Sequence, residues 1–74
     1  MADYREIRKL YDELFERYHG MMTKSDVAQE LGTGREAAGT WLEEAEVPGI
    51  IVGKRIKWET RLVARAIVNA RGMC

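Results

Sequence analysis

The sequence predicts a single, mainly α-helical domain that carries one β-hairpin. Residues 23–41, TKSDVAQELGTGREAAGTW, have the apolar spacing of two short helices joined at a glycine. Residues 47–58, VPGIIVGKRIKW, change to the pattern of two strands around a glycine turn. Together these stretches indicate a small winged helix-turn-helix, with the hairpin as a basic wing and residues 1–20 as an added N-terminal helix.

Length and composition suit one globular domain, residues 1–74. The chain is 46% hydrophobic and 32% charged, which is ordinary for a folded protein. It has no run of about 18 apolar residues, and its N-terminus, MADYREIRKL, is charged. We therefore expect a cytoplasmic protein without a membrane segment, a secretory signal or a membrane partner.

The sequence offers no catalytic constellation. His19 is the only histidine, and Cys74, the last residue, is the only cysteine, so no internal disulfide or zinc cluster is expected. The GTG of residues 32–34 is too short for a nucleotide-binding fingerprint. We expect a protein that is not an enzyme and that uses no metal or other cofactor.

The charges are unevenly distributed along the chain. The net charge is zero, but residues 1–20 carry −1, residues 21–46 carry −4 and residues 47–74 carry +5. This asymmetry indicates a binding partner, and phosphate neutralisation supplies much of the affinity of a nucleic-acid binder.

Residues 1–20 have the pattern of an amphipathic helix. Asp3 and Glu6 have the spacing of a capping box, and Gly20 is expected to end the helix in the left-handed conformation. His19 is expected to be a capping or surface residue. The apolar side chains expected to face the core are Ile7, Leu10, Tyr11, Leu14, Phe15 and Tyr18.

Residues 23–45 are expected to form the helix-turn-helix. Thr23 and Asp26 have the spacing of a second capping box, Gly32 is expected to break the first helix, and the second is expected from about residue 35 to 45. Helical pairs of this kind also occur by chance in all-α domains. The side chains expected to face inward are Val27, Ala28, Leu31, Ala38, Trp41, Leu42 and Ala45, and those expected outward on the second helix are Glu36, Gly39, Thr40 and Glu43.

Residues 47–58 are expected to form the hairpin. Pro48 is expected to end the preceding helix, and Gly53 with Lys54 forms a two-residue turn of type II′. In that register Ile51 faces Ile56 on a packed side, while the other side carries charge. The basic tip is either a protected strand edge or a phosphate contact.

The last helix is expected over residues 59–71. Arg61 and Arg65 lie one turn apart, and Asn69 shares their outward face. The two arginines either extend the positive surface of the hairpin or complement acidic residues of the first helices. The side chains expected inward are Leu62, Val63, Ala66, Ile67 and Ala70.

Helix, turn, helix, basic hairpin and helix, in this order, resemble the excisionase-like helix-turn-helix group, relatives of MerR-type winged-helix DNA-binding domains. The resemblance covers about residues 22–67 and rests on TKSDVAQELG, Arg35, Trp41 and VPGIIVGKRIKW. It implies double-stranded DNA binding, with the second helix in the major groove and the wing against the backbone or minor groove. It also implies an excisionase-like recombination factor or a small regulator of phage or mobile elements.

The resemblance assigns Arg35, Glu36, Ala37 and Thr40 to the base-facing positions of the second helix. Their chemistry fits base edges, because arginine pairs bidentately with guanine, glutamate accepts from cytosine and an alanine methyl contacts the methyl of thymine. Glu43 shares their outward face, and carboxylates are repelled by phosphates. Weak binding by one copy, with help from further copies or from a partner, would resolve that conflict.

The resemblance assigns Lys54 and Arg55 to the tip of the wing. Lys24, Thr33 and Lys57 suit phosphate contacts, which fix register and orientation without reading sequence. Two positions depart from the family pattern. Gly34 replaces the usual serine or threonine cap, and Gly39 lies inside the second helix at a cost of about 1 kcal/mol relative to alanine.

A different class of function is also open. The acidic second helix has small outward residues, Ala37, Gly39 and Thr40, which would let another helix approach closely. A winged-helix fold of this kind would act as a protein-interaction adaptor.

Overall fold

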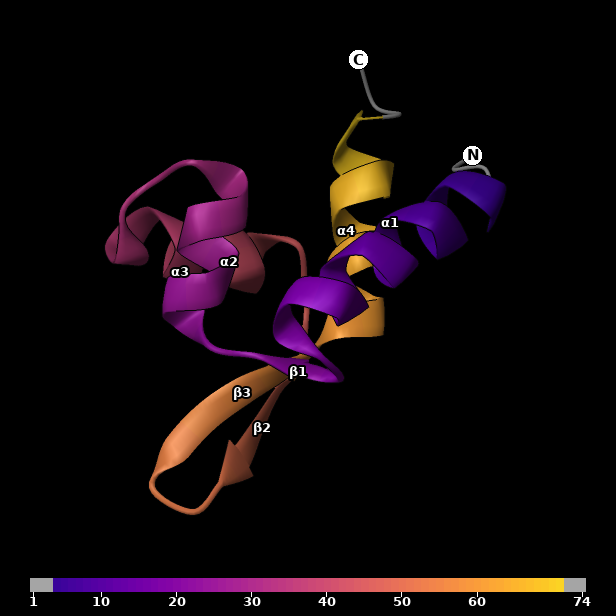
Figure 1. Ribbon diagram of the computed structural model, residues 1–74. Coiled ribbons are helices and arrows are strands. Elements are labelled where there is room, and N and C mark those ends of the chain that lie inside the picture. The colour runs from indigo at the N-terminus through magenta and orange to yellow at the C-terminus, as the bar shows by residue number, and fades with distance from the viewer. Residues whose placement is uncertain (1–3, 72–74) are drawn as a thin grey trace.

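The computed structural model describes residues 4–71 (Figure 1). The domain is mainly helical, with a small three-stranded antiparallel sheet. No helix within the described residues is long and apolar enough to cross a membrane. The expected cap at Asp3 lies outside the described residues. The elements are α1 (Tyr4–Tyr18), β1 (Met21–Met22), α2 (Lys24–Leu31), α3 (Arg35–Glu44), β2 (Gly49–Val52), β3 (Arg55–Glu59) and α4 (Thr60–Arg71).

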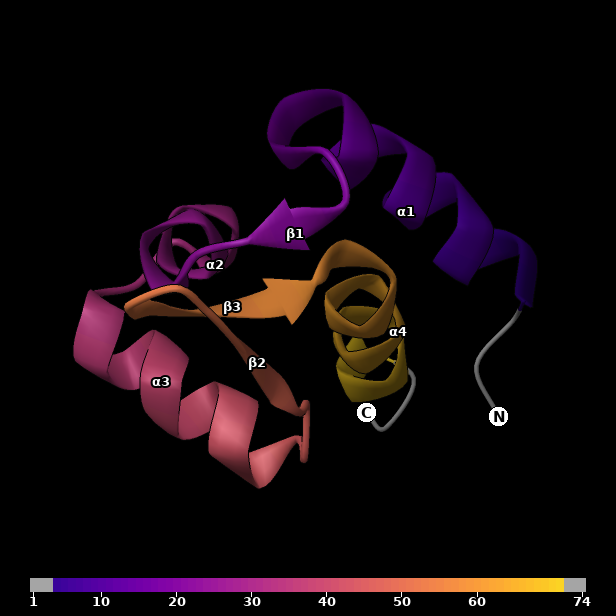
Figure 2. The ribbon, with the colours of Figure 1, turned by 90° about the horizontal axis from the view of Figure 1, so that it is seen from below.

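The helices form two pairs that meet at α4. Helix α1 packs along α4, and α2 packs against α3. Figure 2 shows α4 between α1 and the α2–α3 pair. The hairpin of β2 and β3 extends away from the helices (Figure 1). The largest fully buried side chains are Leu14, Met22, Val27, Leu42, Thr60 and Val63.

The start and end of α2 confirm the sequence prediction. The Asp26 N–H donates to Thr23 Oγ1 over 3.2 Å, and the Thr23 N–H donates to Asp26 Oδ2 over 3.0 Å, so the capping box is complete. Gly32 adopts a left-handed φ of 71°. Val27 and Ala28 are buried, and Leu31 packs at the border of the core.

Helix α1 buries Leu10 and Leu14, as predicted, but Phe15 is exposed. Its end also differs from the prediction. His19, not Gly20, takes the left-handed conformation, with a φ of 65°. His19 is exposed, and its ring packs edge-on against Phe15. The left-handed residue therefore lies one position before the glycine that the local sequence favours.

Strand β1 was not expected from the sequence. Met21 and Met22 pair antiparallel with Glu59 and Trp58, which places β3 between β1 and β2. Met22 is fully buried in the core. Two residues are too few to show an alternating pattern, so only the tertiary pairing reveals this strand.

Helix α3 ends at Glu44, before Pro48 would force it to end. Glu46 adopts a left-handed φ of 57°, and the Val47 N–H donates to the Leu42 carbonyl over 3.0 Å. This Schellman-type end turns the chain and buries Val47. Ala38 and Leu42 are buried and Trp41 is half-buried as expected, whereas Ala45 is exposed.

The hairpin register is confirmed. Ile51 lies opposite Ile56, and Gly49 lies opposite Trp58. The expected packing of that face is wrong along most of its length, because Ile51 and Ile56 are exposed and only Trp58 is buried. The strands extend beyond the helices, so only the base of the hairpin reaches the core.

Helix α4 is buried over a wider arc than a single apolar stripe. Val63 and Ile67 are buried as predicted, and Ala64 and Val68 are buried as well. Ala70, expected inward, is exposed. One side of α4 packs against α1, and Figure 2 shows its other side turned toward the α2–α3 pair.

Candidate nucleic-acid interface

A groove of about 560 Å³ lies between the α2–α3 pair and the hairpin. It brings together Lys24 from α2, Arg35 from α3, and Lys54 and Arg55 from the hairpin tip. We call this set the basic groove. None of these four cations forms an ion pair with a described residue. The remaining residues that line it are Thr23, Ser25, Ile56 and Trp58.

Lys24 is positioned by both helices of the pair. It is the first residue of α2, directly after the Thr23 cap. Its side chain crosses α3 at Gly39, where a Cβ would stand 3.4 Å from Lys24 Cε and 3.5 Å from Nζ. The glycine that weakens α3 therefore leaves room for the lysine. Neither helical pattern alone indicates this contact.

Arg35 begins α3 and is exposed, as are the other residues predicted to face bases. Of that set, only Arg35 lines the basic groove; Glu36, Ala37 and Thr40 lie outside it. The Thr40 hydroxyl donates to the Glu36 carbonyl over 3.2 Å. While this bond is made, the Thr40 hydroxyl can only accept a hydrogen bond. It can donate one to a ligand only after it rotates away from the Glu36 carbonyl.

Thr33, predicted to contact phosphate, lies in the turn before α3 and is also outside the groove. Its hydroxyl donates to the Gly34 carbonyl over 3.0 Å. A phosphate oxygen needs a donor, so Thr33 must release this bond before it can hold a phosphate.

The hairpin presents its cations in two places. Gly53 has a φ of 65°, which permits the two-residue turn and sets Lys54 and Arg55 at the tip. Lys57 is paired with Ile50, and strand alternation places it on the opposite face from Ile56 and Trp58. The structure therefore separates Lys57 from the groove, although the sequence groups it with the tip.

Trp58 forms the floor of the basic groove and was not predicted as part of the site. It is buried, and its indole nitrogen has no hydrogen-bond acceptor among the described residues. No side-chain nitrogen or oxygen among the described residues is both fully enclosed and unpaired, so this N–H retains some exposure. A Cβ at Gly49 would stand 2.7 Å from Ile56 Cγ2 and 3.3 Å from Trp58 Nε1, so glycine is needed for the close approach of β2.

Arg61 and Arg65 lie apart from the basic groove. Both are exposed on α4 and border Tyr4 and Ile7 of α1. Within residues 4–71 neither forms an ion pair. They therefore neither extend the groove nor neutralise the acidic helices.

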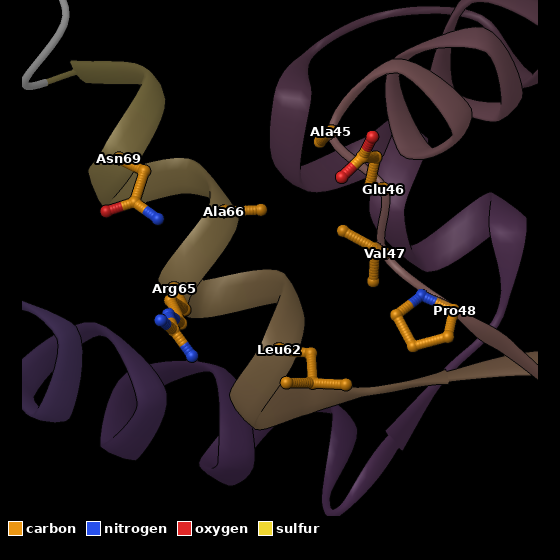
Figure 3. Close-up of a pocket in the computed structure, with 8 residues that line it drawn as sticks. All are labelled: Ala45, Glu46, Val47, Pro48, Leu62, Arg65, Ala66 and Asn69. Carbon is orange, nitrogen blue, oxygen red and sulfur yellow. The ribbon is translucent and has the colours of Figure 1, made fainter.

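A second cleft, about 320 Å³, separates α4 from the chain that leaves α3. Figure 3 shows Ala66 pointing from α4 toward Val47, with Glu46 at one rim and Arg65 at another. Apolar side chains face each other across it, and its polar groups do not converge. The basic groove is the better candidate for a charged ligand.

Residues 4–71 contain no group of three or more histidine, cysteine, aspartate or glutamate side chains that could hold a metal ion. The chain matches no protein-family model, no curated protein and no solved structure. Its function is therefore argued from the basic groove itself.

Proposed function

We propose that this protein is a small winged helix-turn-helix protein that binds double-stranded DNA without catalysis. In this proposal α2 and α3 are the helix-turn-helix, β2 and β3 are the wing, and α1 is the added helix. The observation that carries the proposal is the convergence of Lys24, Arg35, Lys54 and Arg55 on one groove.

Unpaired cations in a groove are what a phosphate backbone requires. Each neutralised phosphate releases condensed counterions, and this release drives binding in low salt. The zero net charge of the chain does not oppose it, because Debye screening confines the effect of distant carboxylates to about 8 Å at physiological salt. The local charge of the groove therefore determines the affinity for the phosphate backbone.

The exposed face of α3 supplies sequence reading in this proposal. Arg35 lies at the start of the helix, where a recognition helix contacts base edges. Glu36 and Ala37 follow it and suit cytosine and thymine. Glu43 lies two turns further on, where it would be repelled by a nearby phosphate, so we expect α3 to enter the major groove by its first turn.

We place the protein among excisionase-like factors or small regulators of phage or mobile elements of the MerR-related type, acting in the cytoplasm. The order of the elements and the basic tip support this placement. Binding by a single copy is expected to be weak, so self-association or a protein partner belongs to the proposal. We propose no cofactor and no membrane partner.

The test is a titration of duplex DNA across salt concentrations. Trp58 lies on the groove floor, so Trp41→Phe leaves one tryptophan whose fluorescence reports binding. Phosphate contacts by Lys24, Lys54 and Arg55 predict a slope of roughly −2.7 for the logarithm of affinity against the logarithm of salt. A slope near zero, or no binding in low salt, would contradict the proposal.

Two variants separate the roles within the groove. Lys54→Ala with Arg55→Ala should weaken binding to all duplexes about equally and reduce the salt slope by about 2, one unit for each phosphate contact. Arg35→Ala should relax preference at one base pair, with a loss of about 1–3 kcal/mol for the preferred site. Arg61→Ala with Arg65→Ala removes the same charge far from the groove and should change neither quantity.

The acidic face of α3 supports a second candidate, a protein-interaction adaptor. Glu36 and Glu43 are exposed, and neither pairs with a cation within the described part of the chain. A partner captured by the wild-type chain should be lost with Glu36→Lys and Glu43→Lys. Capture that is unchanged by these reversals would count against an adaptor that uses this face.

A further inference from the structure

Strand β2 forms an open edge of the sheet. Its one neighbour is β3, so the backbone groups that point away from β3 have no strand partner. The other edge is the two-residue strand β1. The long open edge of this sheet is therefore Gly49–Val52.

The side chains of β2 are apolar on both faces of the sheet. Ile50, Ile51 and Val52 are 41%, 77% and 47% exposed, and alternation points Ile51 to the opposite face from the other two. A continuous apolar run is typical of a strand with neighbours around it. Here the same run lies at an edge in contact with solvent.

Edge strands are usually protected by charges, and β2 has none. The charges of the hairpin, Lys54, Arg55, Lys57 and Glu59, all lie in the turn or on β3. DNA in the basic groove would cover the face of Ile51 and leave that of Ile50 and Val52 in water. A strand paired with β2 would cover both faces, because its own side chains also alternate between them.

We propose that β2 pairs with β2 of a second copy of this chain, antiparallel and about a two-fold axis. The strand is self-complementary for this contact, because each apolar residue meets another apolar residue or Gly49. The two sheets then join into one, ordered β1-β3-β2-β2-β3-β1. The contact is argued without DNA, and it would also provide the self-association that the proposed function includes.

Charge favours a register centred on Ile50. That register places Gly49 opposite Ile51 of the second copy and brings Lys54 at one tip toward Glu46 at the base of the other hairpin. Both side chains are exposed. The two β3 strands, which carry the remaining cations, are then three strand spacings apart, about 14 Å, which exceeds the Debye length of about 8 Å.

In this register three β2 residues of each copy, 49–51, lie opposite β2 of the other copy and Val52 lies opposite Pro48, so the interface is small. Stable complexes bury upwards of about 1,200 Å² in total, so this pairing is reversible and depends on protein concentration. An open apolar edge kept in water would otherwise favour indiscriminate aggregation. A specific dimer confines that tendency to one geometry.

Disulfide trapping of the full chain tests the pairing without DNA. In a Cys74→Ser background, Ile50→Cys places two thiols at the two-fold axis, where the separation of Cα atoms suits a disulfide. Ile56→Cys is similarly exposed, at 53%, but lies on β3, about 14 Å from its counterpart. Under oxidised glutathione, Ile50→Cys should form a covalent dimer and Ile56→Cys should stay monomeric.

Sedimentation equilibrium of the same background without added cysteines provides the second measurement. It should show a monomer–dimer equilibrium, and Ile51→Lys should raise the dissociation constant about tenfold or more by adding edge charge. A chain that remains monomeric at millimolar concentration would overturn the proposal. Equal cross-linking of the two cysteine variants, or none in either while both stay folded, would overturn it as well.

Discussion

The buried hydroxyl of Thr60 donates a 2.7 Å hydrogen bond to the main-chain oxygen of His19. The Thr60 N–H also donates, over 3.0 Å, to the oxygen of Gly20. The first residue of α4 thereby holds the turn that follows α1. Because Thr60 is fully buried, its hydroxyl has no water to bond instead.

Thr60→Val should lower the free energy of unfolding by about 1–2 kcal/mol. Valine keeps the shape of the side chain but leaves the His19 oxygen without its donor. Urea denaturation measures the change. Thr40→Val is the matched control, because the Thr40 hydroxyl is exposed and bonded within its own helix; equal losses in the two variants would show that burial of Thr60 is unimportant.

Gly39→Ala should separate stability from DNA binding. Alanine favours the helix by about 1 kcal/mol, and the flexible end of Lys24 can shift away from the new Cβ. We expect a more stable protein with weaker duplex affinity, because the Lys24 ammonium moves in the basic groove.

The same substitution in a Lys24→Ala background provides the control. Without the lysine, Gly39→Ala should still stabilise the fold but should no longer affect affinity. A loss of affinity that persists there would place Gly39, rather than Lys24, in contact with DNA.

Glu46→Gly should raise the free energy of unfolding by about 1 kcal/mol. Glu46 holds a left-handed φ of 57°, which costs an L-residue about 1–2 kcal/mol and glycine almost nothing. Glu44→Gly, two residues earlier in the last helical turn, should destabilise instead. Thermal unfolding at low protein concentration compares the two, and equal signs would contradict the strain at Glu46.

Tyr18 should make stability fall in alkali. Burial, and then the hydrogen bond and charge of Glu30, raise the pKa of Tyr18 above its ordinary value of 10.0. The unfolded chain then loses this proton at lower pH than the folded chain, so the stabilisation is complete below about pH 10 and declines as the pH rises toward the folded pKa.

Urea unfolding between pH 8 and pH 11 measures that decline. Tyr18→Phe should flatten it, and the difference between the two curves gives the contribution of the Tyr18 phenol. Parallel curves for wild type and Tyr18→Phe would show that the phenol does not contribute.

The features that could be predicted from the sequence are those with a local cause. The Thr23–Asp26 capping box lies within one turn, and the hairpin register follows from a two-residue glycine turn. Both are as predicted. Register also tells which side chains share a face, but it does not tell how far a hairpin extends beyond the helices, and so Ile51 and Ile56 are exposed against expectation.

The features that could not be predicted depend on contacts between distant segments. His19, whose main-chain oxygen accepts from Thr60, takes the left-handed conformation in place of the neighbouring Gly20. In the site, four cations of the predicted set converge on one groove, while Lys57 faces away from it. The role of Gly39 was missed because only the crossing of α2 and α3 reveals the side chain that it accommodates.

The position of α4 in the chain has a consequence during synthesis. Leu14 and Met22 emerge early, yet their packing partners on β3 and α4 emerge last. At roughly 5–20 residues per second, a nascent chain spends several seconds with these side chains uncovered. The core can close only after α4 has left the ribosome, and until then Leu14 and Met22 lack their packing partners.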